Sequence, residues 1–141
     1  MSNQRQDAKT PRRQEPSTEL DALAHNVIGA AIEVHRTLGP GYPESIYEEA
    51  LCYELELQGI PFERQKTIHV SYKGRPCGTG KMDLLIDSQL VVELKTVEDV
   101  LPKHKSQAKA YLVATNGQLA LVINFNVALL KDGLYRVIHN P

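Results

Sequence analysis

The chain has 141 residues, with sixteen Lys and Arg against seventeen Asp and Glu, for a formal net charge of −1. This length fits one domain of about 100 to 150 residues, and the near-neutral charge excludes a general electrostatic attraction to nucleic acid or anionic membranes. Hydrophobic residues make up 42% of the chain, and no stretch approaches the ~18 apolar residues of a membrane span. Any contact with nucleic acid must therefore be local.

The cysteines and the N-terminus bear on cellular location. Cys52 and Cys77 form neither a CxxC pair nor a zinc-finger spacing, and the N-terminus lacks the apolar core of a signal peptide. Isolated cysteines are typical of a reducing compartment, whereas small secreted proteins tend to be rich in disulfides. We therefore expect a cytoplasmic protein.

The first elements of the chain are a tail and two helices. Residues 1–17 contain scattered charges, two prolines and no large apolar residue after the initial Met, which predicts a flexible tail. Thr18 and Asp21 have the spacing of a capping box, and apolar residues then recur every three or four positions, which predicts a helix that ends at residues 39–41. A second helix is expected over residues 44–58, and the domain over residues 18–141.

The rest of the chain is dominated by strand patterns. After Pro61, five segments have the alternation or apolar composition of strands, and one has helical spacing. Residues 73–76 and Gly78–Gly80 are expected to be turns. The order of two helices, three strands, one helix and two strands predicts an α/β fold, with a mixed sheet flanked by helices. The expected strands are 68–72, 81–86, 90–95, 119–125 and 134–138, and the expected third helix is 103–115.

Charged residues interrupt the apolar strand at residues 90–95. Glu93 and Lys95 point to the same face, because side chains alternate along a strand. If residues 87–89 form a hairpin loop, Asp83 lies opposite Glu93, and the two carboxylates repel each other unless something compensates. A cation such as Mg²⁺, which prefers oxygen ligands, would compensate. The alternative is an ordinary surface hairpin in which Lys95 forms a salt bridge.

Two helical positions add candidates. Glu44 shares a helix face with Tyr47 and Leu51, so it is either a third metal ligand or water-positioning base, or simply an acidic residue at a helix N-terminus. Gln107 and Tyr111 are four residues apart and share a face of the third helix. Gln107 either orients a water or a phosphate, or satisfies backbone groups at the edge of the helix.

These residues carry a family resemblance. Gly41-Tyr42-Pro43-Glu44-Ser45-Ile46-Tyr47 matches the GxxExxY signature of a small bacterial family. Asp83, Glu93-Leu94-Lys95 and Gln107-x-x-x-Tyr111 together resemble the PD-(D/E)xK nuclease superfamily, especially its RecB-like branch, with Met82 in place of the proline of the motif. The resemblance spans residues 20–138 and implies a restriction-endonuclease-like core.

The resemblance also implies a site and an activity. Asp83, Glu93 and the carbonyl group of Leu94 would bind Mg²⁺ or Mn²⁺, Glu44 would complete the site, Lys95 would activate or orient the attacking water, and Gln107 would support the substrate or the water. This set suits phosphodiester hydrolysis, which needs a cation, an activated water and a fixed positive group. The implied function is a metal-dependent nuclease acting on nucleic acid. The alternatives are a non-catalytic nuclease-fold binding or regulatory module, and a purely structural interaction protein.

Three further expectations concern the surroundings of the site. RecB-like nucleases can carry a helix histidine near the site, which makes His35 a candidate, with a surface role as the alternative. Lys103, Lys105 and Lys109 either contact phosphates or form the solvated face of their helix. A domain this small offers little surface to grip a duplex, so a homodimer or a partner protein is expected.

Overall fold

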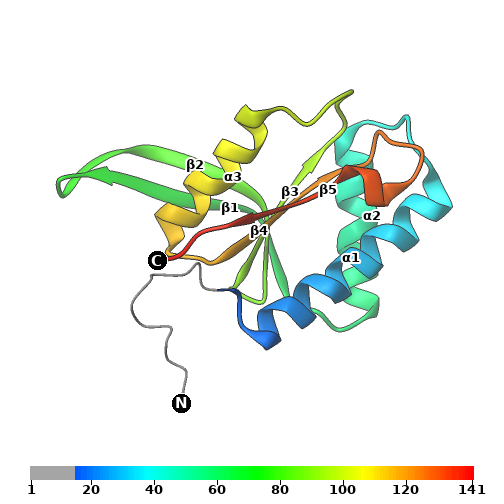
Figure 1. Cartoon of the computed structure of the whole chain (residues 1–141), viewed down its shortest axis with the longest axis horizontal. Coiled ribbons are helices and arrows are strands. Elements are labelled where there is room, and N and C mark those ends of the chain that lie inside the picture. The colour runs from blue at the N-terminus through cyan, green and yellow to red at the C-terminus, as the bar shows by residue number, and fades with distance from the viewer. Residues whose placement is uncertain (1–14) are drawn as a thin grey trace, which may run out of the picture.

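The computed structural model of the chain describes residues 15–141, so the tail predicted over residues 1–17 lies outside the described residues except for its last three. The elements form a mixed sheet with helices on both sides, which confirms the predicted α/β fold (Figure 1). In chain order they are α1 (Thr18–Leu38), α2 (Glu44–Leu57), β1 (Phe62–Tyr72), β2 (Arg75–Ile86), β3 (Leu90–Lys95), α3 (Pro102–Thr115), β4 (Leu119–Asn124), the 3₁₀ helix η2 (Leu130–Gly133) and β5 (Leu134–Ile138).

The sheet has the strand order β1-β2-β3-β4-β5. The pair β3 and β4 is parallel because α3 carries the chain back across the sheet, and the other neighbours are antiparallel. One core lies between the sheet and α1 and α2, and a smaller core lies between the opposite face and α3. Side chains of β3 alternate between them: Val92 and Leu94 face α1 and α2, whereas Val91 faces α3. Glu93 and Lys95 are therefore on the α3 side.

Helix α1 begins one residue earlier than the predicted capping box implies. The hydroxyl of Ser17 accepts a hydrogen bond from the backbone N–H of Leu20 at 3.1 Å, and Thr18 is already the first helical residue. The predicted cap at Thr18 is therefore wrong, because Ser17 has the extended backbone of a cap residue and an oxygen that reaches the third N–H of the helix.

Ser17→Ala tests this assignment. Loss of the cap is expected to lower the free energy of unfolding by about 1 kcal/mol, because the N–H of Leu20 loses its partner. Thr18→Ala is the matched control and should change stability by less than about 0.5 kcal/mol. Urea denaturation of the two variants measures the difference, and equal stabilities would contradict the assignment.

β1 and β2 are longer than the strands predicted over residues 68–72 and 81–86, and they form a hairpin that projects beyond the sheet (Figure 1). Gly78–Gly80, expected to be a turn, belongs to β2 and pairs with residues 68–70 of β1. Pro76 is tolerated because it lies opposite Ser71, beside a shift in register where a ladder hydrogen bond can be lost. The turn itself consists of Lys73 and Gly74, both with positive φ, as in tight hairpin turns.

The alternation of faces reverses where this hairpin joins the sheet. Met82 and Leu84 are both fully buried, but Met82 packs in the α3 core and Leu84 in the α1 and α2 core. On β1, Arg64 pairs with Leu84 and Lys66 pairs with Met82. Gln65, between them, has a φ of 49° and is absent from the ladder. Asp83 therefore lies at the junction between the hairpin and the sheet.

Candidate functional site

The carboxylates of Asp83 and Glu93 each accept a hydrogen bond from a backbone N–H of the opposite strand. The ladder between β2 and β3 has the predicted register, and its last pair is Leu84 with Val92. At the next position, the N–H of Asp83 donates to Oε2 of Glu93 at 2.9 Å, and the N–H of Leu94 donates to Oδ2 of Asp83 at 2.8 Å. Each carboxylate thus binds the opposite strand in place of a backbone carbonyl, which keeps the two acidic groups adjacent.

This arrangement raises the pKa of both groups. Burial, followed by the charge of Asp83, raises the pKa of Glu93 to about 8, although the N–H of Asp83 and the ammonium of Lys95 act against the shift. Burial also raises the pKa of Asp83, against the hydrogen bond from Leu94. Glu93 is only 3% exposed. The strands therefore hold two carboxylates in a place that disfavours their charged forms.

Lys95 and Gln107 meet beside this pair. Lys95 is the last residue of β3, and its Nζ donates to Oε1 of Gln107 on α3 at 3.4 Å. The amide of Gln107 donates in turn to the hydroxyl of Tyr111 at 3.2 Å. The i, i+4 pair on α3 therefore sets the orientation of the Gln107 amide so that its oxygen faces the ammonium group.

Glu44 is the first residue of α2 and is half-buried. Its pKa is raised by burial and then by the negative charge of Asp83, and lowered by Lys95. These mutual effects place its carboxylate in the same electrostatic cluster, although no hydrogen bond joins it to Asp83 or Glu93 in residues 15–141. Sequence spacing left Glu44 between two roles, and its carboxylate lies close enough to Asp83 and Lys95 for their charges to act on its pKa.

The turn before α2 is tied down by the tyrosine of the GxxExxY segment. The hydroxyl of Tyr47 donates to the carbonyl of Gly39 and accepts from the N–H of Tyr42, and its ring stacks on Phe125 at 4.5 Å. Gly41 has a φ of 112°, which few other residues adopt. The glycine allows the turn, the tyrosine holds it, and the start of α2 with Glu44 is positioned as a result.

Tyr47→Phe removes both hydrogen bonds but keeps the ring. We expect the free energy of unfolding to fall by about 1 to 3 kcal/mol, because the N–H of Tyr42 and the carbonyl of Gly39 lose a partner at a partly buried place. Tyr42→Phe is the control, since Tyr42 is 48% exposed. Denaturant unfolding measures both, and a loss no larger in Tyr47→Phe than in the control would contradict this role.

Glu48 follows Glu44 by one helical turn and was not predicted to belong to the site. Its carboxylate accepts from Arg64 at 3.1 Å and from the side chain of Gln65 at 2.9 Å, and its charge contributes to the raised pKa of Asp83. Glu48 thereby connects α2 to the irregular part of β1. The i, i+4 spacing from Glu44 was an available signal for it.

Asn124 was also missed. It is buried at the end of β4, beside Lys95 in the parallel ladder, and its side chain binds both the N–H and the carbonyl of Val97. These bonds fix the chain immediately after Lys95. A polar residue at the end of the otherwise apolar Leu119–Asn124 segment was the only signal in the sequence.

The donor set suits Mg²⁺ without forming a closed cage. Within residues 15–141, no three His, Cys, Asp or Glu side chains converge closely enough to enclose a metal ion. Mg²⁺ usually takes one or two carboxylates and keeps several waters, so the adjacent Asp83 and Glu93 fit it as a pair. Their raised pKa values also favour a compensating cation, because a positive charge stabilises both ionised forms.

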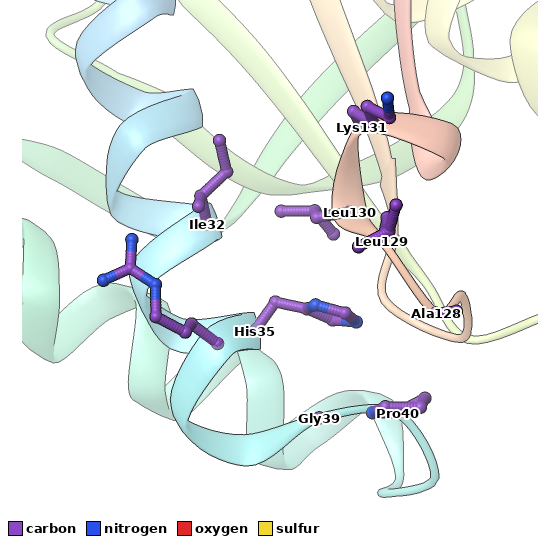
Figure 2. A pocket seen from close by; sticks show the side chains of 9 residues that line it. Ile32, His35, Gly39, Pro40, Ala128, Leu129, Leu130 and Lys131 are labelled. Atoms are coloured by element: carbon purple, nitrogen blue, oxygen red, sulfur yellow. The ribbon is translucent and has the colours of Figure 1, made fainter.

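His35 lines a different cavity, of about 610 Å³, between the end of α1 and the segment before β5 (Figure 2). Its Nε2 is hydrogen-bonded to the carbonyl of Val127 at 2.8 Å. Arg36 and Lys131 also line this cavity, whereas Asp83 and Glu93 do not. His35 therefore anchors the loop after β4.

Comparison with known proteins defines the class of this chain. A family model described as the PD-(D/E)XK nuclease superfamily matches residues 21–137, and the chain belongs to this superfamily. Among solved structures, an alkaline exonuclease from Laribacter hongkongensis is similar, with a TM-score of 0.48 and 13% identity over 91% of this chain and 73% of that one. No curated protein sequence matches the chain. None of the helices within residues 15–141 is long and apolar enough to cross a membrane.

Proposed function

We propose that the chain is a metal-dependent nuclease that hydrolyses phosphodiester bonds of nucleic acid. Asp83 and Glu93 would hold Mg²⁺ or Mn²⁺ as a pair, with Glu44 in the same cluster of charges, as PD-(D/E)XK nucleases generally use divalent metal ions. The observation that carries the proposal is the reciprocal bonding of Asp83 and Glu93 to opposite strands, with Lys95 and Gln107 beside them. Carboxylates that repel each other at a buried place are costly in a purely structural hairpin.

The residues divide the work. A bound divalent ion would neutralise charge on the scissile phosphate and lower the pKa of a bound water. Lys95 supplies a fixed positive charge for the negative charge that develops on the phosphate in the transition state. Gln107, itself oriented by Tyr111, holds the Lys95 ammonium in place. Glu44 completes the ligand set or takes the proton of the attacking water.

Several finer assignments belong to the same proposal. We assign the chain to the GxxExxY family on Gly41, Glu44 and Tyr47, and we place one nuclease domain over residues 18–141. We also propose a cytoplasmic location. A homodimer or a partner protein would enlarge the surface available for a substrate.

The test is a cleavage panel of single- and double-stranded DNA and RNA, with Mg²⁺ or Mn²⁺ and with EDTA. We expect cleavage that EDTA abolishes and that Asp83→Asn lowers by at least about 100-fold. Calorimetric titration with Mn²⁺ should show weaker binding by Asp83→Asn, with Asp87→Asn in the exposed hairpin loop as the matched control. Unchanged metal affinity in Asp83→Asn would exclude Asp83 as a ligand.

The second candidate function is a nuclease-fold binding or regulatory module. The near-neutral net charge of −1 is the observation that favours it, since a nuclease usually attracts its polyanionic substrate. Intact metal binding without cleavage of any substrate in the panel would support this candidate over the nuclease.

A further inference from the structure

A groove of about 760 Å³ runs between the β1–β2 hairpin and α3. Its walls are largely apolar: Val70 is 45% exposed on the hairpin, and Val113 is 57% exposed on α3. Small residues keep it open. A Cβ atom at Gly80 would come within 3.2 Å of the Tyr111 ring, so the glycine allows this ring to lie against the strand. Ala110 forms part of the wall on α3.

The groove leads to the candidate site. Tyr111 lines it, and the hydroxyl of Tyr111 accepts the hydrogen bond from Gln107, whose amide oxygen faces Lys95. Lys103 lies seven residues before Ala110 and therefore on the same side of α3. Both Lys103 and Gln107 are in the N-terminal half of the helix. A ligand in the groove would thus reach the residues beside Asp83 and Glu93.

The elements on both sides of the groove are positively charged. The near-neutral net charge conceals this, because acidic residues gather on α2, on the other face of the sheet. No salt bridge between described residues involves the lysines of α3 or the two basic residues at the hairpin tip. Lys66 pairs with Glu63, but from residue 67 to residue 81 the hairpin carries Lys73, Arg75 and Lys81 and no acidic residue. Helix α3 carries Lys103, Lys105 and Lys109 and no acidic residue, and Lys105 lies over the ring of Tyr135.

An apolar floor between basic rims suits one kind of polyanion. In a single strand of nucleic acid, the flat faces of unpaired bases pack on apolar and aromatic side chains while the phosphates meet Lys and Arg. A duplex encloses its bases and presents mainly phosphates to a protein surface, which leaves an apolar floor without a partner. The exposed Val70 and Val113, together with the partly buried ring of Tyr111, therefore favour an unpaired strand.

We propose that this groove binds one unpaired strand of DNA or RNA and leads it toward Lys95 and Gln107. The direction of the strand rests on the proposed nuclease function, whereas its binding does not. Lys103, one of the α3 lysines with two possible roles, belongs to the rim of the groove, whereas Lys105 lies over the ring of Tyr135 on β5 and faces away from the groove.

Binding is measured by fluorescence anisotropy of labelled oligo(dT), oligo(U) and a DNA duplex in EDTA, so that no cleavage occurs. We expect the single strands to bind at least about tenfold more tightly than the duplex. Val113→Asp should weaken this binding at least about tenfold, because it replaces an apolar contact surface with a negative charge that repels the phosphates. The matched control is Leu129→Asp in the cavity of Figure 2, because Leu129 is also 57% exposed.

Salt dependence gives a second measurement that does not depend on the fold of Val113→Asp. Lys73→Ala combined with Arg75→Ala at the hairpin tip should make the slope of log K against log salt less steep by about 1.4, at about 0.7 for each lost phosphate contact. Arg36→Ala combined with Lys131→Ala, beside the other cavity, should leave the slope unchanged.

The outcomes separate this inference from the proposed function. If Val113→Asp and Leu129→Asp change the affinity for single strands equally, or if the duplex binds more tightly, the groove is not the binding site. This holds even if the wild-type protein cleaves nucleic acid. Single-strand binding that depends on Val113 and on the hairpin tip would support the groove even if no metal-dependent cleavage is found. Tight binding of oligo(dT) alone or of oligo(U) alone identifies the strand as DNA or RNA.

Discussion

Replacing Lys95 with alanine is expected to lower the rate of metal-dependent cleavage by about 100- to 10,000-fold. Lys95 lies at the end of β3, and its ammonium group lowers the pKa of Glu44, Asp83 and Glu93. The same positive charge would stabilise negative charge on the phosphate in the transition state. Single-turnover cleavage with saturating Mg²⁺ measures the loss in the chemical step.

The controls separate catalysis from binding. Lys131→Ala removes an equal charge far along the chain, beside the cavity of Figure 2, and should cleave at the wild-type rate. Gln107→Ala should lower the cleavage rate less than Lys95→Ala does, because Gln107 acts on the reaction by positioning the Lys95 ammonium group. Lys95→Ala that cleaves as fast as wild type would remove Lys95 from the mechanism.

Without metal, the protein is expected to lose stability as the pH rises from about 4.5 to about 8. Glu93 has a folded-state pKa raised to about 8 from its ordinary value of 4.5, so between these values the folded state holds a proton that the unfolded state has released. Stability is therefore fully present at low pH and declines as the pH rises through this window. With about 1.4 kcal/mol for each pKa unit, the full decline is on the order of 5 kcal/mol. The raised pKa values of Asp83 and Glu44 act in the same direction.

Glu93→Gln and metal addition test the cause of this decline. The amide carries no charge, so the variant should be more stable than wild type at pH 8 in EDTA, and its stability should depend less on pH. Mg²⁺ or Mn²⁺ should raise the melting temperature of the wild type at pH 8 and leave that of Glu93→Gln nearly unchanged. Glu56→Gln on the exposed part of α2 is the control and should behave as wild type.

Two results would contradict this account. A wild-type stability that is constant from pH 4.5 to pH 8 in EDTA would show that Glu93 is not destabilised by its surroundings. Stabilisation by Glu93→Gln in EDTA, with no effect of metal on the wild type, would instead favour a structural protein over a nuclease.

Much of the fold follows from local patterns. The helices at Thr18–Leu38 and Glu44–Leu57 and the register of the β2–β3 hairpin were predictable because apolar spacing, Gly and Pro act over a few residues. The strand at Gly78–Gly80 was not, because its conformation depends on pairing with β1 and not on its own side chains. The cap at Ser17 was misplaced by one residue for lack of backbone geometry.

The sequence by itself determined the mixed α/β fold, the opposed positions of Asp83 and Glu93, and the side of the strand that Lys95 shares with Glu93, because strand alternation and hairpin counting are local rules. Only the tertiary structure decided that the Glu93 carboxylate accepts from the N–H of Asp83 and the Asp83 carboxylate from the N–H of Leu94, and that the basic hairpin and α3 enclose one groove. The carboxylate bonds depend on side-chain conformations that a residue pattern does not specify. The groove joins β1 and β2 to α3, which are about 30 to 40 residues apart in the chain and meet only when α3 packs on the sheet.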